Sequence, residues 1–256
     1  MDIRILGAHN CESSTTSCVC FLIDKTLAID AGGLTSHLSL QDQQKLNVIL
    51  LTHKHYDHIR DVPAIALNLS RCGNSINIYT TAPVQAVIET HLLNGTIYPK
   101  FQELPPQKPT VILNVLRPYE TQLLDGHRVK AIPVNHSDDT VGYEVSDAQG
   151  KSVFYTADTG PGLSECWKHA SPDVLIIDVT LPNDQEEFAI ETGHLTPKLL
   201  EDELISFREI RGYLPQVITA HMDTRLEPKI KEEITVVAGN LNIPVIVANE
   251  GMRLSI

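Results

Sequence analysis

Three histidines and an aspartate fall within six positions of the sequence, in the segment His53-Lys54-His55-Tyr56-Asp57-His58. The segment directly follows an apolar run at 48–51 that has the length and composition of a strand. Neutral imidazole and carboxylate are natural ligands of zinc and similar divalent metals. A cation relieves the crowding, because it binds lone pairs that would otherwise compete for donors. The segment therefore predicts a metal site in the loop after this strand.

Three further residues of ligand type lie just beyond the ends of other predicted strands. His136 follows the strand-like run KAIPVN, Asp158 follows SVFYTA, and His221 follows QVITA. Because α/β folds commonly gather their sites at strand ends, we expect these side chains to converge with the first cluster.

The elements that must position these residues are short apolar runs alternating with segments of helical period. The predicted strands are 3–6, 18–23, 27–29, 48–51, 76–79, 111–116, 129–134, 141–145, 153–156, 174–177, 217–219 and 243–247. The predicted helices are 59–69, 84–93, 197–211 and 227–239. Strand clusters interleaved with helices indicate a layered α/β domain with mixed sheets.

The whole chain, 1–256, is expected to form one domain. One segment, 95–118, contains five prolines and few periodic signals, and it is too long for an ordinary connection. It is either a cap over the site or a surface excursion.

Composition narrows the class of ligand. The formal net charge is −12, and no cluster of four or more basic residues occurs, so a long nucleic acid is not the expected partner. The five cysteines form no CxxC pair, no apolar stretch could span a bilayer, and the start of the chain is unlike a signal peptide. We therefore expect a cytoplasmic protein with a small substrate, a metal supplying the positive charge, and no membrane partner. The oligomeric state stays open, with a homodimer among the options.

Taken together, the motifs resemble the metallo-β-lactamase superfamily. LTHKHYDH, VNHSDDTVGY, YTADTG and ITAHMD match its signature of HxHxDH followed by a His, an Asp and a last His, and LAIDAGG is similar to its earlier aspartate motif. The resemblance spans about 24–223. It implies a four-layer αβ/βα sandwich, with two mixed β-sheets flanked by helices and a two-metal site at one edge.

The same resemblance implies seven ligands divided between two metals. His53, His55 and His136 would hold one metal, Asp57, His58 and His221 would hold the second, and Asp158 would bridge them. Asp30 would support the ligand loop without binding metal, or would serve only in turn structure. Two metals roughly 3.5–4 Å apart can share a water and lower its pKa toward about 7, giving a bridging hydroxide. We expect zinc, with Mn and Fe as alternatives, because His and Asp ligands suit all three.

The stretch ETGHLTP indicates which branch of the superfamily the sequence resembles. Thr196 and Pro197 are typical of an N-cap and a first helical position, which places His194 beside a helix N-terminus. This arrangement is similar to ribonuclease Z and the class II cyclic nucleotide phosphodiesterases, in which such a histidine assists departure of the leaving oxygen. The candidate catalytic residues are accordingly Asp57, His194 and Asp178. The Asp-Val-Thr at 178–180 departs from the carboxylate-Ala-Thr of ribonuclease Z, and His194 could instead be a surface residue that caps the helix.

The interval from His136 to Asp158 is too short for the long arm of ribonuclease Z enzymes that process tRNA. The sequence therefore favours a phosphodiesterase that acts on a small phosphodiester such as a cyclic nucleotide. The alternatives are an acyl hydrolase of the lactonase, thioesterase or β-lactamase type, a ribonuclease Z-like RNA endonuclease, and a scaffold that has lost catalysis. The scaffold is disfavoured because all seven ligand positions are present.

Overall fold

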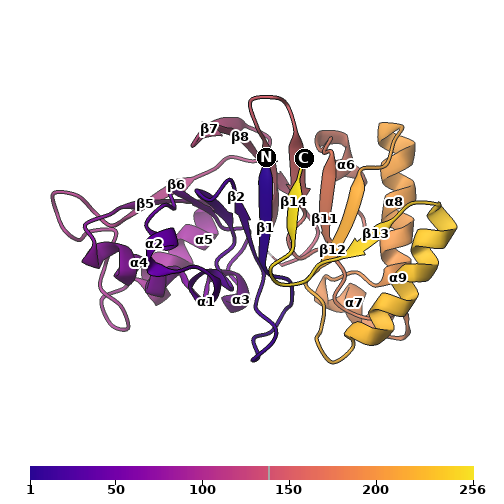
Figure 1. Ribbon diagram of the computed structural model, residues 1–256, viewed down its shortest axis with the longest axis horizontal. Helices are drawn as coiled ribbons and strands as arrows, with labels where there is room; N and C mark the ends of the chain where they lie inside the picture. The colour runs from indigo at the N-terminus through magenta and orange to yellow at the C-terminus, as the bar shows by residue number, and fades with distance from the viewer. Residues whose placement is uncertain (138) are drawn as a thin grey trace.

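The computed structural model describes residues 1–137 and 139–256, which form two seven-stranded sheets lying face to face (Figure 1). The first sheet has the strand order β14-β1-β2-β3-β4-β5-β6. Its strands are β1 (Asp2–Gly7), β2 (Cys20–Ile23), β3 (Leu27–Ile29), β4 (Val48–Leu50), β5 (Ile76–Thr80), β6 (Val111–Val115) and β14 (Arg253–Ser255). Pairing is antiparallel from β14 to β3 and parallel from β3 to β6, so the sheet is mixed.

The second sheet has the strand order β13-β12-β11-β10-β9-β8-β7. Its strands are β7 (Thr121–Leu124), β8 (His127–Pro133), β9 (Val141–Ser146), β10 (Ser152–Tyr155), β11 (Val174–Asp178), β12 (Gln216–Ala220) and β13 (Val245–Val247). Here β10 to β13 run parallel, and β7 to β10 pair antiparallel. β11 is buried along its whole length, and its first four residues form the continuous apolar run VLII that is typical of a strand covered on both faces.

Each sheet carries helices on its outer face. The first half of the chain supplies α1 (Leu34–His37), α2 (Leu40–Gln43), α3 (Tyr56–Ile59), α4 (Val62–Arg71) and α5 (Ala82–Val87), which a π-helical turn continues (Ile88–Leu92). The second half supplies α6 (Ser164–His169), α7 (Glu186–Thr192), α8 (Pro197–Arg211) and α9 (Glu227–Leu241), with a 3-10 turn before α7 (Asn183–Gln185). The two helical groups lie at opposite sides of Figure 1.

Three apolar clusters match these layers: one lies between the sheets, and one lies under each helical group. The predicted four-layer αβ/βα sandwich is therefore confirmed. No helix within residues 1–137 or 139–256 combines the length and apolarity needed to cross a membrane.

The helix prediction was confirmed for a long segment of helical period. The predicted 197–211 coincides with α8, and Thr196 caps it by accepting a hydrogen bond from the Leu199 amide. The predicted 59–69 is wrong as one helix, because it spans parts of two helices, α3 and α4. Short elements such as α1, α2 and β14 escaped prediction because three or four residues carry too little periodicity.

The Pro-rich segment 95–118 contributes to the first half of the molecule. Phe101 is buried in the cluster beneath the helices, and β6 adds a parallel strand to β5. Among the described residues, those that line the pocket at the predicted metal site all lie outside 95–118.

The interface between the two sheets should dominate stability. Phe21 of β2 is 1% exposed and meets Tyr155 of β10 edge to face, with ring centroids 4.7 Å apart. We expect Phe21→Ala to lower the free energy of unfolding by about 3–5 kcal/mol, because it leaves a cavity between the sheets. Urea unfolding measures this loss. As a control, Leu123→Ala removes a side chain that is 74% exposed and should change the free energy by about 0.5 kcal/mol or less. Equal effects would contradict this account of the core.

Candidate metal centre

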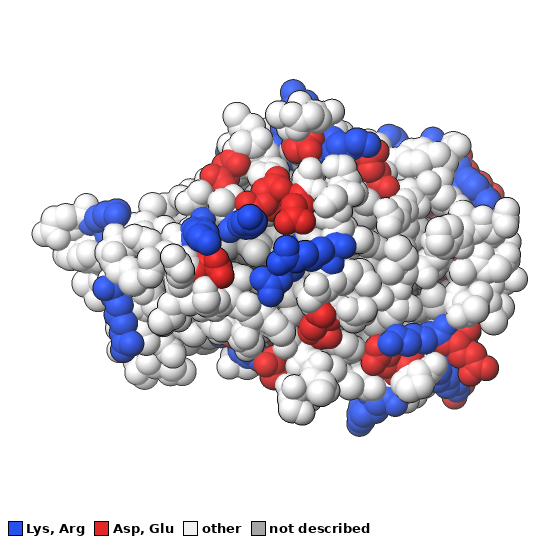
Figure 2. Space-filling view, in the orientation of Figure 1, with Lys and Arg blue, Asp and Glu red and all other residues white. Residues whose placement is uncertain are grey.

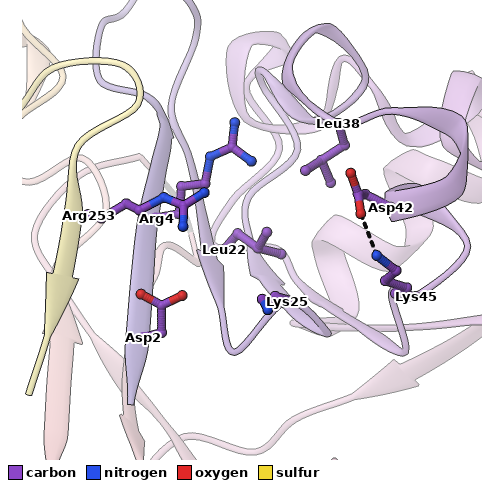
Figure 3. Close-up of a pocket in the computed structure, with 8 residues that line it drawn as sticks. All are labelled: Asp2, Arg4, Leu22, Lys25, Leu38, Asp42, Lys45 and Arg253. Atoms are coloured by element: carbon purple, nitrogen blue, oxygen red, sulfur yellow. Dashed lines mark hydrogen bonds and ion pairs between the residues drawn. The ribbon is translucent and has the colours of Figure 1, made fainter.

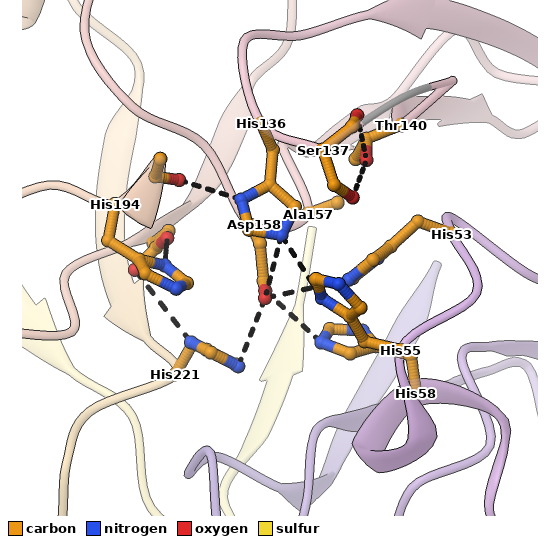
Figure 4. A network of polar contacts seen from close by, with 12 residues as sticks. His53, His55, His58, His136, Ser137, Thr140, Ala157, Asp158, His194 and His221 are labelled. Atoms are coloured by element: carbon orange, nitrogen blue, oxygen red, sulfur yellow. Dashed lines mark hydrogen bonds and ion pairs between the residues drawn. The ribbon is translucent and has the colours of Figure 1, made fainter. Parts of the chain in front are cut away.

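The ends of strands from both sheets bring the predicted ligands together. One group consists of His53, His55, His136 and Asp158, and a second consists of Asp57, His58, Asp158 and His221. Within each group, the possible ligand atoms all lie within 4.8 Å of one another. Figure 4 shows the Asp158 carboxylate at the centre, with His221 on one side and His53, His55 and His58 on the other. All seven predicted ligand residues thus meet, and Asp158 belongs to both groups.

The spacing of the donor atoms fits metal ligation. Around a tetrahedral zinc ion with bonds of about 2.0–2.1 Å, neighbouring ligand atoms stand about 3.3 Å apart. In the first group, His55 Nδ1 lies 3.2 Å from His136 Nε2, and Asp158 Oδ2 lies 3.7 Å from His53 Nε2. In the second group, His221 Nε2 lies 3.2 Å from Asp57 Oδ2 and 3.3 Å from Asp158 Oδ2.

Buried atoms in both groups lack hydrogen-bond partners. His53 Nε2, His58 Nε2 and Asp158 Oδ1 have none within the described part of the chain. Although Oδ1 lies 3.2 Å from His58 Nε2, the two do not meet in hydrogen-bonding geometry. A buried polar atom without a partner is costly, and these three converge on the same space. The residues present therefore fit a bound cation.

Protonation states favour ligation in the first group. Burial lowers the pKa of His53 well below its usual value, and the neighbouring His58 lowers it further. Burial also lowers the pKa of His55 and that of His136. These rings are therefore neutral near pH 7, which is the form that binds metal.

The second group carries more negative charge. Burial raises the pKa of Asp158, but His221 and His58 more than offset it, so its pKa falls well below the usual range. Burial lowers the pKa of His58, whereas the carboxylates of Asp158 and Asp30 raise it well above the usual range. In the chain alone, a proton would therefore stay on His58. A cation in this group would take the place of that proton.

Hydrogen bonds behind the ligands orient the rings. Asp30 is fully buried and lies 2.7 Å from His58 Nδ1, while its other contacts are to the amide and hydroxyl of Thr52. Asp30 belongs to neither ligand group and supports the ligand loop. The Thr52 hydroxyl in turn lies 3.0 Å from His53 Nδ1. Each contact leaves the ring's Nε2 free to face the centre.

The second sheet supplies the same kind of support. The carbonyl of Gly193 accepts a hydrogen bond from His136 Nδ1 at 2.9 Å, and the Thr180 hydroxyl lies 2.8 Å from His221 Nδ1. Sequence reasoning did not identify Thr52, Thr180 or Gly193 in these roles. The only available signal was their position beside the motifs, in Leu-Thr-His, Asp-Val-Thr and Gly-His-Leu-Thr.

His194 lies next to the ligand groups and is bound to Asp178. Its Nδ1 is 2.7 Å from Asp178 Oδ2, and its ring is stacked on that of His221 with centroids 5.4 Å apart. Burial lowers the pKa of His194, but the Asp178 carboxylate more than offsets this and raises the pKa to about 9. Cations in the neighbouring groups would lower it again by repulsion. The arrangement holds Nδ1 in place and leaves Nε2 as a donor.

A pocket of about 510 Å³ opens over these residues. Asn10, Glu12 and Cys18 form part of its wall, together with His194 and the exposed side chain of Tyr56. Tyr56 is 66% exposed, so it does not serve in core packing.

The loop 10–17, which contributes Asn10 and Glu12 to the pocket wall, is fixed by a buried contact outside the pocket. His9 Nδ1 lies 2.7 Å from Glu250 Oε1, which also accepts a hydrogen bond from the Ser17 amide at 2.9 Å. Burial raises the pKa of Glu250, but its hydrogen bonds to His9 and to backbone amides lower the pKa to about 2. The carboxylate therefore stays charged and ties both ends of the loop 10–17 to the C-terminal part of the chain.

Comparisons with known proteins agree with this fold. The sequence model of one family, described as the beta-lactamase superfamily domain, matches residues 22–222. A comparison with curated proteins gave no match. Among solved structures, unliganded yeast PDE1 is similar with a TM-score of 0.82 and 18% identity, over 100% of this chain and 99% of that chain. The short form of human tRNase Z has a TM-score of 0.68 and 20% identity, over 100% and 99%. A diphosphatase from the PhnP family has a TM-score of 0.63 and 19% identity, over 100% and 97%.

Gly193 offers a test of ligand positioning. A Cβ at this residue would lie 2.8 Å from His136 Nδ1, and its φ of +73° is strained for other residues. We expect Gly193→Ala to displace His136 and to weaken metal binding by about 10- to 100-fold, as measured by competition with a chelator.

Gly212→Ala is the matched control. Gly212 also has a positive φ, of +79°, but a Cβ there would meet nothing within 4 Å. It should strain the backbone equally and leave metal affinity unchanged. If both variants bound metal alike, the close approach of Gly193 to His136 would not matter for the metal.

Proposed function

Because the chain belongs to the metallo-β-lactamase superfamily of metal-dependent hydrolases, we propose that it is a dinuclear phosphodiesterase acting on a small phosphodiester such as a cyclic nucleotide. The observation that carries the proposal is the hydrogen-bonded pair of His194 and Asp178 beside the two ligand groups. Many kinds of hydrolase use a metal centre alone. A proton donor positioned next to the metals is needed when the leaving group departs poorly without a proton.

Seven side chains would hold the two cations. His53, His55 and His136 would bind one, Asp57, His58 and His221 the other, and Asp158 would serve both. When bound, the cations would neutralise the non-bridging phosphate oxygens and lower the pKa of water toward about 7. Zinc is the proposed metal, because its preferred ligands are imidazole and carboxylate; Mn and Fe tolerate the same set.

The chain itself would manage the leaving group. Asp178 holds Nδ1 of His194, so the imidazole presents Nε2 toward the pocket and can carry a proton there. Asp178 is itself fixed by the Thr180 hydroxyl at 2.6 Å and the Thr159 amide at 3.0 Å. His194 would donate its proton to the departing alkoxide, and the Asp178 carboxylate would stabilise the charged ring before that step.

Three features support a small substrate. The pocket of about 510 Å³ has the size of a small-molecule site. Between His136 and Asp158, the described residues form β9 and β10 joined by a short turn, which leaves no length for a tRNA-binding arm. The net charge of −12 disfavours a long polyanion.

A hydrolysis screen tests the function. Purified protein reloaded with Zn, Mn or Fe would be assayed on cyclic nucleotides, bis(p-nitrophenyl) phosphate, a lactone, a thioester and a precursor tRNA. Turnover of the small phosphodiesters with poor cleavage of the others supports the proposal. Preferred hydrolysis of the lactone or thioester, or specific cleavage at a tRNA 3′ end, contradicts it.

Metal stoichiometry tests the dinuclear centre. Fully loaded protein should carry close to two metals per chain, and Asp158→Ala should weaken both sites, because this carboxylate belongs to both ligand groups. Metal analysis after dialysis measures the effect. Asp184→Ala is the control, since it removes an exposed carboxylate outside both groups. A single tight metal that survives Asp158→Ala would reject two metals.

The leaving group tests the role of His194. Nitrophenolate departs without a proton, whereas a ribose alkoxide needs one. His194→Ala should therefore reduce kcat by about 10²–10⁴-fold on a nucleotide diester and far less on bis(p-nitrophenyl) phosphate, at unchanged metal content. His91→Ala, which alters an exposed histidine elsewhere, should change neither. Equal losses on both substrates would indicate phosphate positioning, and loss of metal would make His194 a ligand.

A further inference from the structure

A second cavity, of about 190 Å³, lies on the outer face of the first sheet. Figure 3 shows the side chains around it, which come from β14, β1, β2, the turn between β2 and β3, and the region of α1 and α2. Four of the lining residues are basic, two are acidic and two are apolar: Arg4, Lys25, Lys45, Arg253, Asp2, Asp42, Leu22 and Leu38. This composition contrasts with the net charge of −12 of the whole chain.

The basic residues are arranged by strand register. Arg4 of β1 is paired with Arg253 of β14 on one side and with Leu22 of β2 on the other. Ile3 and Ile5 point into the core between the sheets, so Arg4 points to the opposite, helical face. Leu38 and Lys45 stand over this row. The cavity therefore lies where the helical layer stops covering the sheet.

Among the described residues, most of these basic side chains form no ion pair. Lys45 is paired with Asp42 at 2.6 Å, but Arg4, Lys25 and Arg253 have no carboxylate within salt-bridge distance in the portion of the chain that the structure covers. Asp42 is held by Lys45 and Ser39, which leaves Asp2 as the one other acid in the lining. Figure 2 shows Lys and Arg side chains near the middle of this face, over β1 and β14, with acidic side chains beside them.

The register of the two arginines is itself unfavourable. Like charges directly opposite on paired antiparallel strands destabilise the pair. Arg4 and Arg253 occupy such opposite positions. Two guanidinium groups side by side are stabilised by an anion that accepts hydrogen bonds from both, and guanidinium geometry suits the oxygens of phosphate.

Lys25 is presented by a fixed turn. Asp24 and Lys25 have φ values of 46° and 68°, which only a well-supported turn holds at non-glycine residues. The support comes from Asp24, whose carboxylate accepts a hydrogen bond from the Asp2 amide at 2.7 Å and lies 2.9 Å from His127 Nε2. The ammonium group is therefore attached to a rigid wall of the cavity.

We propose that this cavity is a second ligand site, which binds a small phosphate-bearing anion between Arg4, Arg253 and Lys25. The volume is below the roughly 300–1,000 Å³ of sites for drug-sized ligands, so it fits a phosphate group or a diphosphate.

This site is separate from the metal centre. Arg4 lies in the first half of β1, whereas His9 follows the other end of that strand. Lys25 lies in the turn before β3, whereas Asp30, which supports the ligand loop, follows the other end of β3. The residues that line the two pockets do not overlap. A ligand here would therefore act beside the proposed hydrolysis, as an effector or a tether, and the inference does not depend on that function.

Phosphate binding to the metal-loaded protein tests the proposal. Thermal unfolding and calorimetric titration would compare inorganic phosphate with chloride at equal ionic strength, in wild type and in Arg4→Gln/Arg253→Gln. Phosphate should raise the Tm of the wild type, and the double variant should bind it about 10- to 100-fold more weakly through the cavity. Without phosphate, the double variant should be at least as stable as wild type, because the repulsion is removed. Binding at the metal centre contributes equally to both proteins.

Two further variants keep the test decisive. Arg71→Gln/Arg117→Gln makes the same charge change at residues outside the cavity lining and should retain the phosphate response. Lys25→Gln alters an exposed side chain, so it should fold normally and still weaken binding. A parallel titration with a nucleoside diphosphate distinguishes a site for free phosphate from a site for the phosphate end of a larger ligand. If phosphate and the diphosphate bound equally to wild type and to both cavity variants, or if only a single-stranded RNA bound, the proposal would be overturned.

Discussion

The geometry of the metal centre depends on one buried carboxylate, Asp158, which faces imidazoles from both halves of the chain. A carboxylate in an apolar interior is stable only when opposite charge or hydrogen bonds surround it. Asp158 lies within 4 Å of ring nitrogens of four histidines, of which His53 and His58 follow β4 in one sheet and His136 and His221 follow β8 and β12 in the other. The two sheets can bring these rings together only because an apolar core holds them face to face. The electrostatic balance around Asp158 therefore depends on the packing between the two sheets.

The backbone at these strand ends carries strain that the surrounding contacts hold in place. Asp30, Ala157 and His221 have φ values near +60°, a region costly for residues other than glycine. The Asp30 amide donates to the Leu50 carbonyl at 2.8 Å, and the His221 amide donates to the Ala8 carbonyl at 2.6 Å. These two bonds hold the backbone in its positive-φ conformation just beyond β3 and β12, and the positive φ of Ala157 directly precedes Asp158. Such strain is typical of sites whose geometry is fixed before a ligand binds.

The metal centre and the cavity on the first sheet both depend on strands to place their side chains, but in different ways. At the metal centre, residues just past the strand ends converge from two sheets. On the outer face of the first sheet, Arg4 and Arg253 converge because neighbouring strands place them side by side. The helical layer covers the rest of that face and leaves these residues accessible. In the proposed anion site, acidic charge elsewhere on the chain would favour a small anion over a long one.

Local features of the sequence predicted a large part of this protein. The apolar runs predicted most strands, and the strand-helix alternation predicted the layered α/β class, because both depend on periods within a few residues. The spacing of His53, His55, Asp57 and His58 indicated a metal loop for the same reason, and Thr196 with Pro197 marked the start of α8. Short helices and the edge strand β14 were beyond such reasoning, since tertiary contacts stabilise them and their own residues show no period.

Tertiary structure alone decided which partner each functional group has. The acceptor for His136 is the carbonyl of Gly193, 57 positions away, and Arg253 meets Arg4 from the other end of the chain. No local pattern encodes these pairs, because hydrogen bonds and charge contacts between distant residues depend on how the two sheets and their loops pack. The sequence by itself determined which groups could bind a metal, through residue type and spacing. The fold determined how they share Asp158, which contacts orient them and where unpaired positive charge gathers, because burial and distance arise only once the chain is packed.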